Sequence, residues 1–465
     1  MAAADGAPVP AAAPQVETVG AARVLARPLV APPPAWVDTP AMPRPPRDAE
    51  GAATLDLLGD VQVLFGKESD TFYYGQAWQI GTAQGLDGGS LQIDWDPALE
   101  KLTIHRYRVL RDGQPIDLLG DGSRLSVIQR EKRMESAMLD GRLTTTYQPE
   151  DLRVGDVIDL AYTIERRDPA LAGRSQYVVG PKDGATFGRF RARMLWGNDK
   201  AMRWRVYPGI LQPHLIKTAK GSELVADLGE MSAPLAPEGA PSRFQLVNAI
   251  EITEFADWQG VSRSFAPLYA EAIKLAPNSP IRAEAARIAA QTRDPRRRAE
   301  LALQLVQEQI RYLFMGMNAG GFVPASAEQT WARRFGDCKA KTVLLIALLG
   351  ELGIEARPVL VHTQQGDLLT ARLPNMESFD HVIVEAKIAG KSHWLDGTRL
   401  GDLSLDQLET PNWKAGLPVT AQGSALVRME PDPLDAPREF VSLTLDASRG
   451  LDLPASAVGE MRFHG

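Results

Sequence analysis

The stretch GDCKAKTVLLIALLGELG, residues 336–353, combines a turn, a helix cap and a long apolar run. Gly336 permits a sharp turn, and Asp337 is a favourable N-cap. Every residue from Val343 to Leu349 is apolar, so the helix has no polar face and belongs in the centre of a domain. Cys338 falls in its first turn, where free backbone N–H groups and the helix dipole favour a thiolate. The stretch predicts a buried helix with a nucleophile at its start.

Cys338 is the only cysteine among the 465 residues, which excludes an intrachain disulfide. A single cysteine fits two roles, a small buried apolar residue or a catalytic nucleophile. Catalysis requires a base and a group that orients the base. Both occur in a second stretch, downstream of the helix.

The second stretch, FDHVIVEAKIAGKSHWLDGT (residues 379–398), is typical of two strands joined at Ala389-Gly390. With a two-residue turn there, Asp396 lies opposite Ile383, and His381 is two residues along on the same face. Diagonal partners have backbones ~7–8 Å apart, within reach of an imidazole and a carboxylate. His393 falls on the opposite face. His362 is a weaker candidate for the base, because the sequence places no carboxylate to orient it.

Three motifs together resemble a known family. Gly336-Asp337-Cys338-Lys339, His381 in FDHVIV and Asp396 in WLDGT resemble the Cys, His, Asp order and spacing of the transglutaminase-like superfamily, the papain-related cysteine acyltransferases and peptidases. The resemblance covers about residues 255–410. It implies a Cys338, His381, Asp396 triad on an α+β core with a central helix against an antiparallel sheet. Ala340 departs from the acidic residue usual in bacterial relatives, which affects the helix start more than the chemistry.

The resemblance implies acyl transfer through a thioester on peptide or protein amide bonds. Water as acceptor gives a peptidase or amidase, and an amine gives a transglutaminase. One oxyanion donor is expected at the backbone N–H of Cys338, and a side-chain donor at Gln329 or Trp331 in the preceding loop. The alternative is a catalytically silent scaffold or peptide-binding protein. No cofactor is expected, and six scattered histidines give no metal-ligand spacing.

Before this core the chain has the pattern of a β protein. Short alternating or β-branched segments separated by Gly, Asp and Pro run from about Leu55 to Ile252, which predicts one large or two smaller β-sandwich-like units. The phrases IHRYRVLRDGQPIDLL, DGRLTTTYQPEDLRVGDVIDLAYTI and ITEFADWQGVSRSFAPLY resemble the uncharacterised β-rich domain that often precedes such cores in bacterial proteins. Helices are expected from about Ser264, with Ser279-Pro280 and Asp294-Pro295 as helix starts.

The expected organisation has four parts: a proline-rich leader (1–50), the β-rich region (51–254), the catalytic domain (255–416) and a C-terminal β segment (417–465), which the resemblance suggests is shortened. Residues 1–48 hold eleven of the 34 prolines. Such a leader favours extended backbone lying partly against the domain through Trp36, with a ligand for a proline-recognition module as the alternative.

Composition and the N-terminal sequence limit the partners and the cellular location that we expect for the protein. The net charge of −7 argues against nucleic-acid partners, and no apolar run is long enough to span a membrane. The start MAAADGAPVPAAAP lacks the basic and apolar regions of a secretory signal but resembles what remains after A-x-A cleavage. It favours a bacterial periplasmic or extracellular protein, with the cytoplasm as the alternative. The expected partner is a peptide or protein substrate, and oligomeric state is left open.

Overall fold

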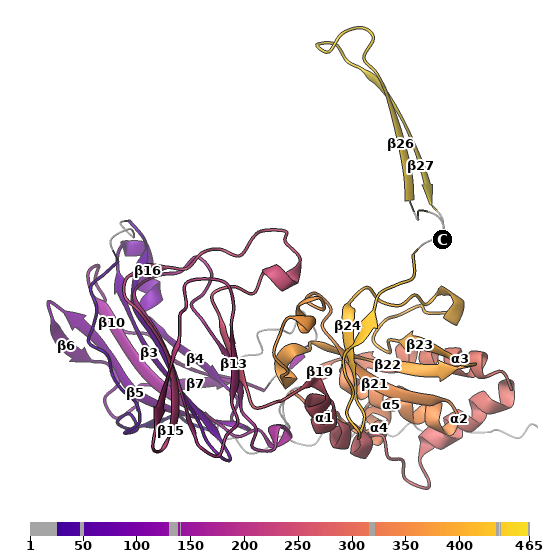
Figure 1. The fold of residues 1–465 in the computed structure, drawn as a ribbon, viewed down its shortest axis with the longest axis horizontal. Helices are drawn as coiled ribbons and strands as arrows, with labels where there is room; N and C mark the ends of the chain where they lie inside the picture. Colours follow the sequence, from indigo (N-terminus) through magenta and orange to yellow (C-terminus); the bar gives the residue numbers. More distant parts are fainter. Residues whose placement is uncertain are drawn as a thin grey trace, which may run out of the picture.

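The computed structural model describes residues 26–46, 51–129, 138–139, 141–315, 321–433, 437 and 439–463. The chain forms a β-rich body followed by an α+β body, and a C-terminal hairpin projects away from both (Figure 1). The predicted α+β class, with a β-rich N-terminal region before the core, is confirmed.

A ten-stranded sheet is the centre of the β-rich body. Of the two predicted alternatives, one large β-sandwich-like unit therefore fits better than two smaller units. Its main path runs β1-β5-β10-β3-β2-β12-β15-β14, with β6 beside β5 and β16 beside β12. The strands are β1 Leu29–Val30, β2 Thr54–Phe65, β3 Asp70–Ile80, β5 Glu100–Arg111, β6 Gln114–Asp117, β10 Val157–Arg166, β12 Thr186–Gly197, β14 His214–Thr218, β15 Gly221–Leu228 and β16 Met231–Ser232.

Two three-stranded sheets cover one face of the large sheet. One packs on β5 and β10 around Trp95 and Tyr107, and the other packs on β2 and β12 around Phe190 and Ile252. Their strands are β4 Leu91–Trp95, β9 Leu143–Tyr147 and β7 Ser126–Gln129 in the first, and β11 Gln176–Val179, β17 Ile250–Thr253 and β13 Arg203–Val206 in the second. The layers form the sandwich that the alternating segments predict.

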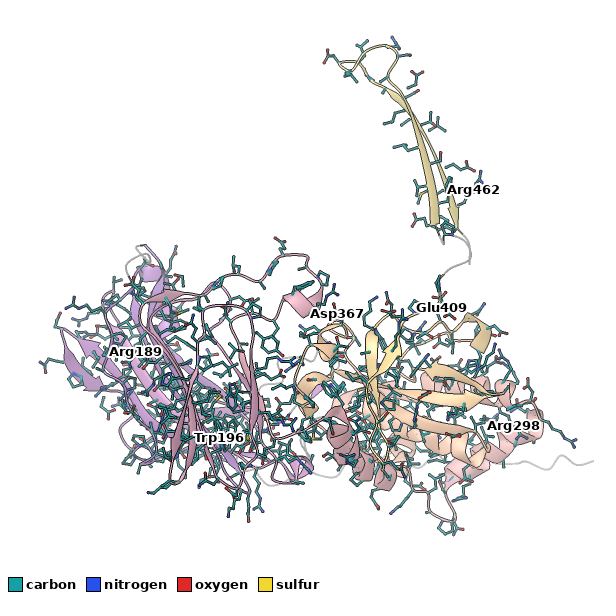
Figure 2. All side chains as sticks on the ribbon, in the orientation of Figure 1. Arg189, Trp196, Arg298, Asp367, Glu409 and Arg462 are labelled. Carbon is teal, nitrogen blue, oxygen red and sulfur yellow. The ribbon has the colours of Figure 1, made fainter. Side chains whose placement is uncertain are left out.

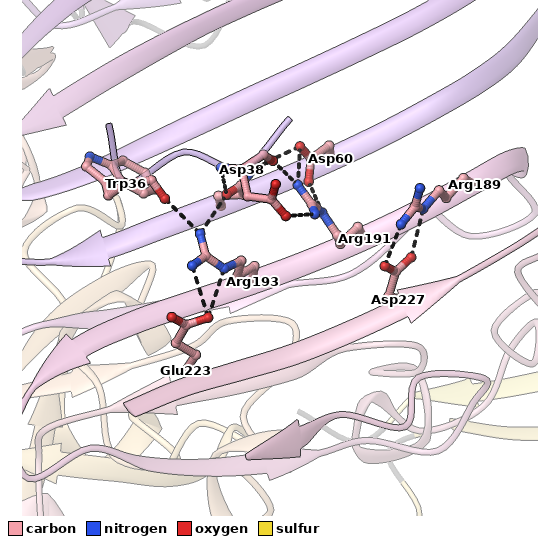
Figure 3. Close-up of polar contacts among 9 residues, drawn as sticks. Trp36, Asp38, Asp60, Arg189, Arg191, Arg193, Glu223 and Asp227 are labelled. Atoms are coloured by element: carbon pink, nitrogen blue, oxygen red, sulfur yellow. Dashed lines mark hydrogen bonds and ion pairs between the residues drawn. The ribbon is translucent and has the colours of Figure 1, made fainter. Parts of the chain in front are cut away.

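The opposite face of the large sheet is charged. Along β12, even-numbered residues from Phe190 to Trp196 enter the apolar core, while Arg189, Arg191 and Arg193 point to the other side. These arginines pair with carboxylates on the neighbouring strands and on the N-terminal segment (Figure 3). The partners are Asp227 for Arg189, Asp60 and Asp38 for Arg191, and Glu223 for Arg193.

This ion-pair layer holds the described part of the proline-rich leader against the sheet. Arg193 Nη1 donates to the backbone oxygen of Trp36 at 2.8 Å, and Arg191 Nη1 donates to Asp38 at 2.8 Å (Figure 3). Residues 26–46 therefore lie along the β-rich body, and the contact at Trp36 is made by its backbone. Residues 1–25 and 47–50 of the predicted leader lie outside the described residues.

In its described residues, the second body packs five helices on one face of an antiparallel sheet ordered β23-β22-β21-β24-β25. The helix α5 is buried along most of its length and lies against β21 and β22, as predicted (Figure 1). The first helix begins at Trp258 rather than near Ser264, because Asp257 caps it. The elements are α1 Trp258–Ala272, α2 Pro280–Gln291, α3 Pro295–Gln309, α4 Ala327–Arg333, α5 Cys338–Glu351, β21 Glu355–Val361, β22 His381–Ile388, β23 Lys391–Leu395, β24 Lys414–Pro418 and β25 Val427–Met429.

The sheet of the second body extends past the predicted boundary at residue 416. Strand β24 pairs with β21, and β25 pairs with β24, so residues up to Met429 complete this sheet. Two short parallel pairs add to the body: β18 Arg311–Tyr312 with β20 Phe335–Gly336, and β19 Phe314–Met315 with β8 Met138–Leu139 from the β-rich region.

The C-terminal hairpin consists of β26, Glu439–Asp446, and β27, Ser456–Phe463, which lie within the predicted C-terminal β segment. All of its side chains are exposed and extend from the ribbon without a covering element (Figure 2). Within the described ranges, no helix is long and apolar enough to cross a bilayer. No group of three potential metal ligands is found in the same ranges.

Candidate active site

Cys338 is the first residue of α5 and is 7% exposed. Asp337 caps the helix, since its Oδ1 accepts from the backbone N–H of Ala340 at 2.9 Å. Ala340 packs against Gly336, where a Cβ would lie 2.6 Å from that of Ala340. The helix start is therefore intact despite the alanine at this position. The sulfur lies at the positive end of a buried helix, as predicted.

His381 and Asp396 lie on one face of the hairpin β22-β23, in the predicted register. Val384 pairs with Leu395, which places Ile383 opposite Asp396. The turn residues Ala389 and Gly390 have φ values of 50° and 80°, as a type I′ turn requires. His381 Nε2 and Asp396 Oδ2 are 2.9 Å apart.

A second set of contacts fixes this pair. Asp396 Oδ1 accepts from the backbone N–H of Thr398 at 2.9 Å and from its hydroxyl at 2.7 Å. The His381 ring meets the Trp413 ring edge-on, with centroids 5.9 Å apart. The hydroxyl of Thr342 on α5 donates to the backbone oxygen of Val382 at 3.1 Å, which ties the helix to the strand that carries His381. The imidazole is thus held from both sides.

The electrostatics of the site favour a charged pair. Burial alone lowers the pKa of His381, but its hydrogen bonds to Asp396 and to Cys338 outweigh burial and raise the pKa to about 10. Burial raises the pKa of Asp396, yet the bonds from His381 and Thr398 more than offset it and leave that pKa below its ordinary value. Because Nε2 faces Asp396, Nδ1 is the ring nitrogen that is left to interact with the sulfur. At neutral pH the imidazole is therefore protonated, between a carboxylate and a sulfur.

Cys338 and His381 open into a cavity of about 410 Å³. Its wall is largely aromatic and apolar, and Glu377 and Asp380 bring carboxylates to it. Such a lining, apolar with a few polar groups, is typical of a ligand-binding pocket. The lining residues are Phe265, Tyr269, Tyr312, Gly321, Phe322, Cys338, Lys339, Leu360, Met376, Glu377, Phe379, Asp380, His381 and Val382.

The two predicted side-chain oxyanion donors lie elsewhere. Gln329 is exposed and closes a capping box with Ser326 at the start of α4. Trp331 packs into the core, and the Arg334 guanidinium lies 3.6 Å from the centroid of its ring. Neither residue lines the cavity that holds Cys338. The prediction placed them by closeness in sequence, but the short helix α4 directs both away.

The other two histidines considered for the base lie outside this cavity. His393 pairs with Ala386 in the hairpin, on the face opposite His381. His362 does have a carboxylate neighbour, contrary to the prediction, because its Nδ1 lies 3.3 Å from Asp380 Oδ2. That nitrogen also accepts from the backbone N–H of Gln365 at 3.0 Å, so it serves the local loop structure.

The β-rich body holds the access loop, residues 362–380 between β21 and β22, which forms part of the cavity wall. Asp367 is bonded to Ser242 and Arg243 across the boundary between the bodies, where Figure 2 labels it. Further along the loop, the backbone N–H of Met376, a cavity residue, donates to Gln176 Oε1 at 2.8 Å. The β-rich body therefore contributes to the shape of the site.

Glu251 on β17 is the main anchor of the access loop. It is 1% exposed, and its carboxylate accepts from Arg372 Nε at 2.9 Å, from the Leu373 backbone N–H at 2.9 Å and from Asn375 Nδ2 at 2.7 Å. Sequence reasoning missed this residue. The signal was a lone carboxylate between isoleucines in a strand, since alternation sends Ile250 and Ile252 into the sandwich core and Glu251 to the other side.

Removing the Glu251 carboxylate is expected to release the access loop. In Glu251→Ala, the Arg372 guanidinium loses a buried partner, which lowers the free energy of unfolding by about 3–5 kcal/mol. Amide hydrogen exchange should accelerate in residues 362–380. The control is Arg243→Ala, which removes the ion pair between Arg243 and Asp367 of the same loop. Because Arg243 is 48% exposed, this variant should lower the free energy of unfolding by about 1 kcal/mol or less. Unchanged exchange in the loop of Glu251→Ala would contradict the anchoring role.

Comparisons with known proteins agree with this two-part architecture. Residues 67–225 match the family model of a domain of unknown function, DUF3857, and residues 282–396 match that of the transglutaminase-like superfamily. The second match includes Cys338, His381 and Asp396. No curated protein matches the chain.

The solved structures that match the chain include the following two. One, described as a “putative protease” from Parabacteroides distasonis, has a TM-score of 0.63 at 12% identity and covers 86% of this chain and 79% of its own. The other, described as a “putative cysteine protease” from Cytophaga hutchinsonii, has a TM-score of 0.23 at 12% identity over 62% of this chain and 84% of its own, too low to bear on the fold. The chain therefore carries a DUF3857 domain followed by a transglutaminase-like domain.

Proposed function

We propose that the protein hydrolyses amide bonds in peptides or proteins through a thioester on Cys338. The observation that carries the proposal is the shared cavity, in which a sulfur at a helix N-terminus meets an imidazole that is 2.9 Å from a buried carboxylate. A nucleophile, a base and a group that orients the base are the three parts that this chemistry needs. The name of the Parabacteroides distasonis relative favours peptide bonds as the target.

In the acylation step, the Cys338 sulfur attacks the carbonyl carbon, and an S–C bond forms. His381 gives its proton to the leaving nitrogen as the C–N bond breaks, and the amine departs. The raised pKa of His381 suits this step, because the imidazole already holds the proton that the amine requires.

In the deacylation step, water attacks the thioester carbon while His381 accepts a proton from it. Acylation has by then removed the negative charge and hydrogen bond of the sulfur, two of the influences that raise the pKa of His381. The pKa therefore falls when the group must act as a base. The S–C bond then breaks, the carboxylic acid leaves, and the sulfur regains its negative charge beside the protonated imidazole.

A peptide library tests the proposal and separates its rivals. Wild type and Cys338→Ala are incubated with a mixed peptide library, with and without a fluorescent primary amine, and the products are identified by mass spectrometry. New peptide termini formed by the wild type alone support hydrolysis. Amine adducts that require Cys338 overturn hydrolysis in favour of transamidation. If neither product forms, the silent scaffold or peptide-binding protein replaces the enzyme.

A further inference from the structure

The site needs a second donor to the oxyanion that forms during acyl transfer. The tetrahedral intermediate carries a negative oxygen, which enzymes of this chemistry stabilise with donors fixed in advance. The backbone N–H of Cys338 supplies one donor. Gln329 and Trp331 do not reach the cavity. A side-chain donor must therefore come from the residues that line the cavity.

Tyr269 on α1 has the properties of such a donor. Its side chain lines the cavity beside Cys338 and is only 2% exposed. Its hydroxyl has no hydrogen-bond partner in the part of the chain that the structure describes. Buried hydroxyls are nearly always bonded, because an unpaired one loses its bonds to water without replacement. An unpaired hydroxyl beside a nucleophile suggests that its partner arrives with the substrate.

The surroundings of Tyr269 keep its proton in place. Burial, followed by the charges of Cys338 and Asp337, raises the pKa of Tyr269 well above its ordinary value. The phenol therefore remains a donor at every pH at which the enzyme would work. The hydroxyl makes no hydrogen bond to the sulfur. An oxyanion donor is expected to point at the position that the substrate oxygen will occupy, next to the nucleophile, and not at the nucleophile itself.

We propose that the Tyr269 hydroxyl donates a hydrogen bond to the oxyanion of the tetrahedral intermediate formed at Cys338. The proposal rests on the acyl-transfer function given above. Tyr312 also lines the cavity, but it is 37% exposed, so it is not a buried group that lacks a partner. Tyr312 is therefore the rival candidate that the experiment has to separate from Tyr269.

Two reactions of the same sulfur isolate the role of Tyr269. Acylation by p-nitrophenyl acetate passes through a tetrahedral oxyanion: an S–C bond forms, p-nitrophenolate leaves, and its release is recorded. Alkylation by iodoacetamide displaces iodide at a saturated carbon and forms no oxyanion. Tyr269→Phe is expected to slow acylation by ~10²–10³-fold. Alkylation of Tyr269→Phe should stay within about twofold of wild type. If Tyr312→Phe slows acylation and Tyr269→Phe does not, the proposal is overturned in favour of the other tyrosine.

The outcomes separate this proposal from the proposed function. Equal rates of acylation in Tyr269→Phe and wild type overturn the donor role while leaving the nucleophile in place. Equal slowing of both reactions also overturns it, because a general disturbance of Cys338 would have that effect. If wild type is not acylated at all, the proposed function fails together with the donor role. The melting temperature of Tyr269→Phe should match or exceed that of wild type, since an unpaired buried hydroxyl is removed.

Discussion

The variant Asp396→Ala is expected to acylate Cys338 ~10²–10⁴-fold more slowly than wild type. Asp396 is 8% exposed, and its carboxylate holds His381 Nε2 at 2.9 Å. Loss of the carboxylate frees the imidazole to rotate and removes a charge that stabilises the protonated ring. The measurement is the rate of p-nitrophenolate release from p-nitrophenyl acetate, with intact mass to verify a single adduct.

A graded comparison strengthens this test. Thr398→Val removes one of the two hydrogen bonds to Asp396 Oδ1 and leaves the one from the backbone. Its effect should be less than about tenfold, because a single hydrogen bond is lost while the carboxylate remains. If Asp396→Ala acylated Cys338 as fast as Thr398→Val does, a different group would have to orient His381.

The parts of the site that sequence predicts correctly are those fixed by local geometry. The turn at Ala389-Gly390 requires positive φ, and the two-residue period of strands then fixes the face on which His381 and Asp396 lie. The start of α5 follows from Asp337 and the apolar run behind it. In each case the determining residues lie within a few positions of the feature.

The parts that sequence does not predict are those set by packing between distant segments. Tyr269 reaches the cavity from α1, and its pattern in the sequence marks it only as a core residue of an amphipathic helix. Glu251 holds the access loop from a strand of the other body. The contact between His362 and Asp380 depends on the path of the same loop. No periodicity within one segment indicates which other segment will face it.

Alkylation of Cys338 by iodoacetamide is expected to be rapid and nearly independent of pH between pH 6 and 8. The pKa of His381 is raised to about 10, so the imidazole stays protonated throughout this range and stabilises a negative sulfur. A raised pKa means that the protonated form is complete well below pH 10 and is lost only as the pH approaches that value. Because the chain has one cysteine, whole-protein mass reports this sulfur alone.

The variant His381→Ala should convert this flat profile into that of an ordinary thiol, whose labelling climbs as the pH approaches about 8.5. At pH 6 the variant should react roughly 10–100-fold more slowly than wild type, because the positive charge that favours a negative sulfur is lost. His393→Ala is the control, since His393 lies on the other face of the hairpin and should leave the profile unchanged. A buried structural cysteine would label slowly at every pH below unfolding and would not respond to His381→Ala. That behaviour in the wild type would exclude Cys338 as a nucleophile.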